Sequence, residues 1–183
     1  RGLRAGGQVV PANARTDTID FITIPTAGNA TDFGNLTQVK FAPASAASRS
    51  RAVFMCGGTP TRLSEIDFVT VSSTGNAANF GSMTAARSAG GQSGFSNQTR
   101  AICVGGSPDT GASTVDIIDF ITISTFGNAE DFGDLASITY SGGAVGNSTR
   151  GFKLGGYSPG ISNAVHVFTF ASKGDAVDDV NLA

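Results

Sequence analysis

The sequence predicts an all-β fold built from four repeated units. One phrase recurs with small changes, and such self-similarity indicates that a single supersecondary unit has been duplicated. β-Branched and aromatic residues dominate this phrase, and 25 of the 183 residues are glycine, a composition that suits short strands joined by tight turns. The copies occupy residues 18–36, 65–83 and 114–135, with a more divergent copy at 165–182.

Each unit opens with an arginine, a short apolar run and a pair of glycines. The pairs are Gly6-Gly7, Gly57-Gly58, Gly105-Gly106 and Gly155-Gly156, and their first members are 51, 48 and 50 residues apart. A period near 50 residues is typical of β-propeller blades. We therefore expect a single repeat domain over residues 1–183, with units of approximately 1–50, 51–99, 100–149 and 150–183, the first and last incomplete.

The strand count leaves the architecture open. Four units of four strands would contain sixteen strands. The chain begins at the second strand of the first unit, so only fifteen strands are expected. A four-bladed ring would need the missing strand from elsewhere, so an open linear stack of β-units is the alternative to a propeller. The chain begins with Arg1 and not with methionine, which is expected of a fragment or a processed chain.

A central strand is expected in every unit after the glycine pair. It covers residues 19–24, 66–71, 118–123 and 165–170, where alternating residues on both faces are largely apolar. Such a strand is covered on both sides. In a propeller, neighbouring blades provide this cover.

A turn and an outer strand follow the central strand. The turn is Gly-Asn-Ala in three units and Gly-Asp-Ala in the last, and these residues tolerate positive φ. A phenylalanine then recurs at Phe33, Phe80 and Phe132, and we expect it to pack each unit against the next. The last unit has Asp179 at this position, as expected for an end unit without a further neighbour.

Segments rich in Ala, Gly and Ser complete the units. They cover residues 42–48, 88–96 and 141–147, and we assign them to the innermost strands, where backbones crowd around the axis. Turns are expected at residues 48–50, 97–99 and 147–149, leading back to the arginine that opens the next unit.

The two cysteines are expected to be free, buried thiols that act as small hydrophobic residues. Cys56 directly precedes a glycine pair, whereas Cys103 lies two places before Gly105. Strand alternation then points the two thiols to opposite faces, so we predict no bridge between them.

Composition excludes several classes of function. The formal net charge is −2, the Lys and Arg residues are scattered, and no basic field is available for nucleic acid. No apolar run reaches the ~18 residues of a membrane span. One histidine and two tyrosines do not supply the clustered ligands of a metalloenzyme on a propeller scaffold such as the galactose-oxidase-like proteins, so no cofactor and no metal is predicted.

The pattern resembles the kelch repeat. The shared features are the glycine pair after an apolar strand, an aromatic residue at Phe21, Phe68 and Phe120, and a second at Phe33, Phe80 and Phe132. Kelch repeats usually have Tyr and Trp there, so the match is to a divergent branch. The phrases Ile-Asp-Phe-Ile-Thr-Ile and Gly-Asn-Ala-x-Asp-Phe-Gly-x-Leu closely resemble tandem kelch-like repeats in structural proteins of marine bacteriophages, especially cyanophages. The resemblance covers essentially the whole chain and implies a fibre, tail or surface component of a virion.

No catalytic constellation is visible in the sequence. The one histidine, His166, stands where the other units have Asp20, Asp67 and Asp119, so it is interpreted as a strand residue near the rim of a blade and not as a general base. We expect the aspartates to accept hydrogen bonds from nearby turns. A cation site would need several oxygens close together, which one carboxylate per unit does not supply.

Binding is expected at the loops that vary between units. They cover residues 8–18, 59–65, 107–117 and 157–164, and we expect them to emerge together at one end of the blades, as loops on a rigid scaffold often carry recognition. The candidate binding residues are Arg15, Arg62, Asp109 and Tyr157, against the alternative that they are merely solvated.

These observations favour a non-enzymatic structural or adhesion module of a phage virion. Its expected partners are other virion proteins or a host-surface glycan, it would be present in multiple copies, and it would not enter a membrane. The alternative is a cytoplasmic kelch adaptor that grips a peptide with the same loops.

Overall fold

The computed structural model describes residues 1–90, 92–109, 113–157 and 159–183. Its described residues form fifteen strands in four antiparallel sheets and no helix. Consecutive strands pair in order within each sheet. Sheet I contains β1 (Gly2–Val9), β2 (Ala14–Ile22) and β3 (Thr31–Asn35); sheet II contains β4 (Ala44–Ala47), β5 (Arg51–Met55), β6 (Glu65–Thr70) and β7 (Ala78–Ser82).

Sheets III and IV repeat the plan of sheet II. Sheet III contains β8 (Gly94–Ser96), β9 (Arg100–Gly106), β10 (Val115–Thr122) and β11 (Glu130–Asp134); sheet IV contains β12 (Gly143–Gly146), β13 (Arg150–Tyr157), β14 (Ile161–Thr169) and β15 (Val177–Asn181). Sheet I has three strands and the others have four. The predicted all-β class and strand count are confirmed.

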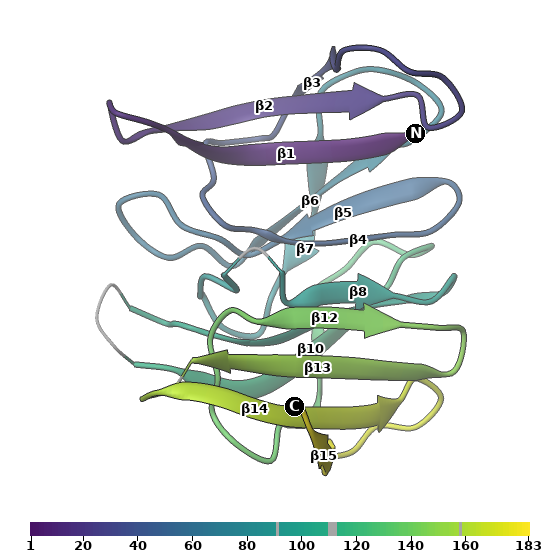
Figure 1. Cartoon of the computed structure of the whole chain (residues 1–183). Coiled ribbons are helices and arrows are strands. Elements are labelled where there is room, and N and C mark those ends of the chain that lie inside the picture. The colour runs from purple at the N-terminus through teal and green to yellow at the C-terminus, as the bar shows by residue number, and fades with distance from the viewer. Residues whose placement is uncertain (91, 110–112, 158) are drawn as a thin grey trace.

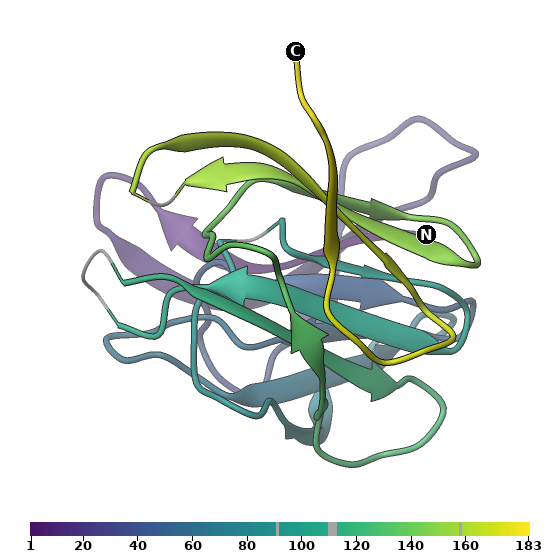
Figure 2. The same ribbon diagram turned by 90° about the horizontal axis from the view of Figure 1, so that it is seen from below.

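The sheets follow one another in chain order. Figure 1 shows sheet I at the top and sheet IV at the bottom, and Figure 2, seen from below, shows sheet IV in front of the others. Each sheet packs on the next through one apolar cluster, between I and II, II and III, and III and IV. Among the described residues, no such cluster joins sheet I to sheet IV.

The central strands β2, β6, β10 and β14 follow the predicted positions. In sheets II and III they are covered on both faces, and Ile66, Ile118 and Ile121 are buried. In the two end sheets one face has no neighbouring sheet, and Ile22 of β2 is exposed. The two inner sheets thus show the two-sided cover that the sequence predicts for the central strand.

The predicted turns between the first two strands of sheets II to IV are confirmed. In each, the residue after the first strand donates its amide to the carbonyl of the opening arginine, at 2.8 Å from Ser48 to Arg51 and 2.9 Å from Asn147 to Arg150. Asn97 and Asn147 add a side-chain acceptor for the amides two and three residues later. Asn in such turns holds its own backbone in this way.

The recurrent phenylalanines pack between sheets, as predicted. Phe33, Phe80 and Phe132 are buried, each in the cluster that its sheet shares with the next one. Phe132 lies between Phe120 of its own sheet and Phe168 of sheet IV, with ring centroids 5.8 and 5.7 Å away. The expectation for Asp179 concerns a side chain outside the described part of the structure.

Backbone hydrogen bonds join the outer strand of each sheet to the Gly-Asn-Ala or Gly-Asp-Ala turn of the next. Gly75 donates to the Phe33 carbonyl at 2.7 Å, and the same bond recurs from Gly127 to Phe80 and from Gly174 to Phe132. The turns come so close that a Cβ added at Gly34, Gly81 or Gly133 would lie within 3.0 Å of their backbone. Glycine is therefore required at these three outer-strand positions.

The opening arginines also cross from sheet to sheet. The guanidinium of Arg1 donates to the Val71 carbonyl at 2.9 Å, that of Arg51 to Ile123 at 2.8 Å, and that of Arg100 to Phe170. Each also lies over an aromatic ring, with Arg51 4.6 Å from the Phe126 centroid. Cation–π contact of this kind favours Arg over Lys.

Candidate functional site

The variable turns after β1, β5, β9 and β13 gather at one end of the molecule, which we call the loop end. They lie on the left in Figure 1. The connections between sheets reach the same end, because short main-chain bridges join Phe41 to Gly58, Ser88 to Ser107 and Tyr140 to Tyr157. Four sheets thus support one composite surface of turns.

Arg62 and Asp109, both predicted from sequence, lie together in this surface. Arg62 is in the turn after β5, and its Nε donates to the backbone carbonyl of Asp109, in the turn after β9, at 2.8 Å. The Ser107 hydroxyl donates to the same carbonyl at 2.8 Å. The guanidinium therefore ties the loop surface of sheet II to that of sheet III.

Arg15 and Tyr157 lie in strands, which corrects the prediction that they are loop residues. After a bulge at Gly6, β1 continues to pair with β2, so that Gln8 faces Arg15. Tyr157 likewise ends β13 and faces Ile161. Since Arg15 belongs to sheet I and Tyr157 to sheet IV, the four predicted residues are spread along the loop end and do not form one cluster.

Each strand that opens a unit bends near its end through two residues with positive φ. The first is Gly6, Gly105 or Gly155 in three sheets and Cys56 in sheet II, with φ of 64°, 59°, 55° and 52°. The structural repeat in sheet II is thus Cys56-Gly57, one residue earlier than the glycine pair predicts. A non-glycine residue in this region is uncommon.

The two thiols face each other, so the prediction that they point to opposite faces is wrong. Cys56 lies after β5 in a left-handed conformation, where strand alternation no longer applies, and its Sγ is 3.9 Å from that of Cys103. Both cysteines are free and fully buried. The hydrogen bond with Cys103 lowers the pKa of Cys56 to about 7, while the pKa of Cys103 is raised.

Two of the repeated aspartates form buried ion pairs that the sequence reasoning missed. Asp67 lies 3.1 Å from the Lys40 Nζ, and Asp119 lies 2.8 Å from the Arg87 Nη1. Threonine hydroxyls donate to the same carboxylates, from Thr37 at 2.6 Å and from Thr84 at 2.7 Å. Asp67 and Asp119 accept hydrogen bonds as expected, but the donors are threonine side chains of the connections between sheets. The repeated spacing Thr-x-x-Lys and Thr-x-x-Arg was the available signal for the cations.

His166 is a residue of β14, as the prediction of a strand residue requires, and its side chain is buried. Its Nε2 lies 3.4 Å from the Ser137 hydroxyl, and its buried Nδ1 has no hydrogen-bond partner among the described residues. Burial lowers the pKa of the imidazole. A serine with an imidazole that no carboxylate orients lacks the third member of a catalytic triad.

Lys153, opposite His166 in β13, is a third buried cation. Its Nζ donates to the carbonyls of Ser141 and Gly155, but no carboxylate pairs with it in the described part of the chain. Desolvation lowers the pKa of this amine to about 8. Lys153 is therefore a charge whose burial only carbonyl oxygens offset.

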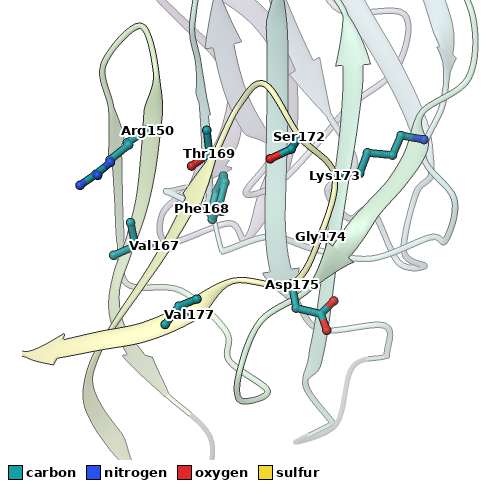
Figure 3. Close-up of a pocket in the computed structure, with 9 residues that line it drawn as sticks. All are labelled: Arg150, Val167, Phe168, Thr169, Ser172, Lys173, Gly174, Asp175 and Val177. Atoms are coloured by element: carbon teal, nitrogen blue, oxygen red, sulfur yellow. The ribbon is translucent and has the colours of Figure 1, made fainter.

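A hollow of about 400 Å³ opens on sheet IV. Figure 3 shows Arg150 and Val167 pointing to the same side of the β13–β14 hairpin, with Val177 below them and Lys173 pointing away. Lys173 instead pairs with Glu130 of sheet III at 2.6 Å. The hollow lies on the face of sheet IV that has no neighbouring sheet.

The described residues contain no group of three or more His, Cys, Asp or Glu side chains placed to hold a metal ion. The described residues also form no helix that is long and apolar enough to cross a membrane. The chain matches no family model and no curated protein.

Proposed function

We propose that the protein is a non-enzymatic scaffold module whose loop end binds another macromolecule. The observation that carries this proposal is the Arg62 bridge, which holds variable turns of two different sheets in one surface. Rigid sheets that present irregular turns are a common arrangement for recognition. The single histidine, without a carboxylate to orient it, supports a binding role over a catalytic one.

The proposed architecture is an arc of a kelch-like propeller. Its support is the close approach of the small-residue strands, since a Cβ added at Gly94 of β8 would lie 2.7 Å from the backbone of Ser45 in β4. Small residues let inner strands converge on an axis. The open linear stack remains the alternative, and an electron microscopy map of the assembled protein would separate the two, because only an arc directs β4, β8 and β12 toward one axis.

The proposed setting is a phage virion, as a structural or host-attachment element in several copies. This rests on the resemblance to kelch-like repeats of phage structural proteins. The loop end would face a host glycan or a neighbouring virion protein. Immunogold labelling of purified particles tests the setting, since particles that carry none of this chain would remove it.

A binding assay tests the role of the loop end. The full chain, immobilised through its C-terminus, is exposed to host cell-envelope extract and to disrupted particles. Arg62→Ala and Tyr157→Ala should reduce the captured material, whereas Ser124→Ala, at an exposed position of the turn between β10 and β11, should not. Equal losses in all three variants would contradict the proposal. Capture of a cytoplasmic peptide alone would favour the kelch-adaptor alternative.

A further inference from the structure

The three junctions between sheets are built from the same parts. The earlier sheet provides an opening arginine, a phenylalanine and a glycine in its outer strand. The later sheet provides a Gly-Asn or Gly-Asp turn, whose side-chain oxygen accepts the amide of the residue after that glycine. This last bond measures 3.0 Å at every junction, from Asn35 to Asn76, from Ser82 to Asn128 and from Asp134 to Asp175.

Sheet I has the features with which a later sheet joins the sheet before it, but no sheet packs on that face among the described residues. Ile22 and Ile24 are 47% and 69% exposed. Their equivalents in the other sheets face the preceding sheet, and Val69, Ile123 and Phe168 are at most 4% exposed. The Gly28-Asn29 turn is also exposed, and Asn29 makes no junction bond among the described residues.

The repeated aspartate of sheet I lacks its buried partner too. Asp67 and Asp119 bind a threonine and a cation from the connection that precedes their sheets. Asp20 instead lies 3.6 Å from Arg4 of its own sheet, and both side chains are partly exposed. Asp20 could therefore bind the threonine and the cation of a Thr-x-x-Lys or Thr-x-x-Arg segment, as Asp67 and Asp119 do.

Sheet I is also incomplete at its first edge. In sheets II to IV a short strand rich in Gly, Ala and Ser pairs with the arginine strand, as β4 does with β5. No strand pairs with the free edge of β1 in the described residues. Hollows of about 280 and 220 Å³ lie there, between Leu3 on β1 and Ser45 on β4. An unpaired edge of this kind accepts an added strand.

Sheet IV has lost the matching parts on its own uncovered face. Val180 occupies the register position of Gly34, opposite Val165 as Gly34 is opposite Ile19. Its side chain would collide with a docked turn. Val167 replaces the aromatic ring under the opening arginine, and the Arg150 side chain reaches no other sheet in the described structure. Sheet IV of a second copy therefore does not fit sheet I.

We propose that the outer face of sheet I is a docking face for one further β-unit of this repeat. The occupant carries Phe-Gly in its outer strand and an opening arginine that reaches the Ile24 carbonyl. A Thr-x-x-Lys or Thr-x-x-Arg connection brings a cation to Asp20, and a small-residue strand pairs with β1. This inference goes beyond the proposed function, because docking of a unit does not depend on what the loop end binds.

The docking face can be tested in the full chain by giving sheet IV the junction residues of the other sheets, so that sheet IV of one copy can dock on sheet I of another. The restored variant carries Val167→Phe, Asp179→Phe and Val180→Gly, the residue types of the other sheets. A blocked variant adds Ile24→Glu at an exposed side chain of sheet I. Sedimentation velocity over a concentration series gives the mass of each. We expect the wild type and the blocked variant to be monomers and the restored variant to form head-to-tail chains. An equimolar mixture of wild type and blocked variant should double in mass, because one supplies each face.

Circular dichroism and thermal melts establish that each variant is folded. If the triple change unfolds the chain, Val180→Gly with Val167→Phe alone replaces it in the same assay. A folded restored variant that stays monomeric overturns the proposal. If the wild type itself associates, the single change Ile24→Glu is made in it. Loss of that association would assign the face to a second copy, and association that persists would show that the face is not used; either result also overturns the proposal.

Discussion

Gly81→Ala should separate sheet II from sheet III. At Gly81 φ is +156°, and an added Cβ would lie within 3.0 Å of the Gly127 backbone. Strain at such a φ costs about 1–3 kcal/mol. The clash also displaces the docked turn and its three hydrogen bonds, from Gly127 to Phe80, from Ala129 to Ser82 and from Ser82 to Asn128, each contributing about 1 kcal/mol. The expected total loss is about 4–6 kcal/mol.

Two matched glycines separate strain from clash. Gly127 has a φ of +152° with no atom within 4 Å of an added Cβ, so Gly127→Ala should cost only the strain, about 1–3 kcal/mol. Gly28 has neither the positive φ nor a close neighbour, so Gly28→Ala should be neutral or stabilise by up to about 1 kcal/mol. Urea unfolding followed by circular dichroism measures all three. A Gly81→Ala loss no larger than that of Gly127→Ala would refute the close-approach argument.

Three further outcomes are expected. Asp119→Asn leaves a fully buried guanidinium unpaired and should cost about 3–5 kcal/mol in urea unfolding, against less than about 1 kcal/mol for Asp20→Asn in its exposed pair; equal losses would contradict the burial argument. Between about pH 8 and 10.5 the folded chain holds Lys153 neutral while the unfolded chain protonates it, so stability should rise with pH by up to about 3 kcal/mol, and a Lys153→Met variant that rises as much would disprove this. Iodoacetamide should modify Cys56 and Cys103 only after unfolding, and rapid labelling of the native protein would show that the second junction opens freely.

Much of the fold follows from local chemistry. The central strands were predictable because runs of β-branched and aromatic residues favour extended backbone whatever surrounds them. The turns at residues 48–50, 97–99 and 147–149 follow from Ser and Asn, which bond their own backbone. The burial of Phe33, Phe80 and Phe132 follows from one large apolar side chain per repeat.

Less of the candidate site could be predicted from the sequence. Arg62 and Asp109 were named as separate loop residues, and their bridge depends on how sheets II and III are placed. The cysteine prediction failed because Cys56 sits in a left-handed conformation that breaks strand alternation. The ion pairs of Asp67 and Asp119 went unforeseen because their cations belong to connections that only packing brings back to the next sheet.

The sequence by itself determined the repeat, the strands, the turns and the apolar residue at each junction, since all of these arise within one unit. Only the tertiary structure decided which units touch, how closely Gly34, Gly81 and Gly133 approach the next turn, and that one face of sheet I and one face of sheet IV are left without a neighbouring sheet. The physical reason is that a junction joins groups some forty to seventy residues apart, such as Asn35 with Asn76 and Arg1 with Val71. Their meeting is set by the placement of whole sheets and not by the preferences of neighbouring residues.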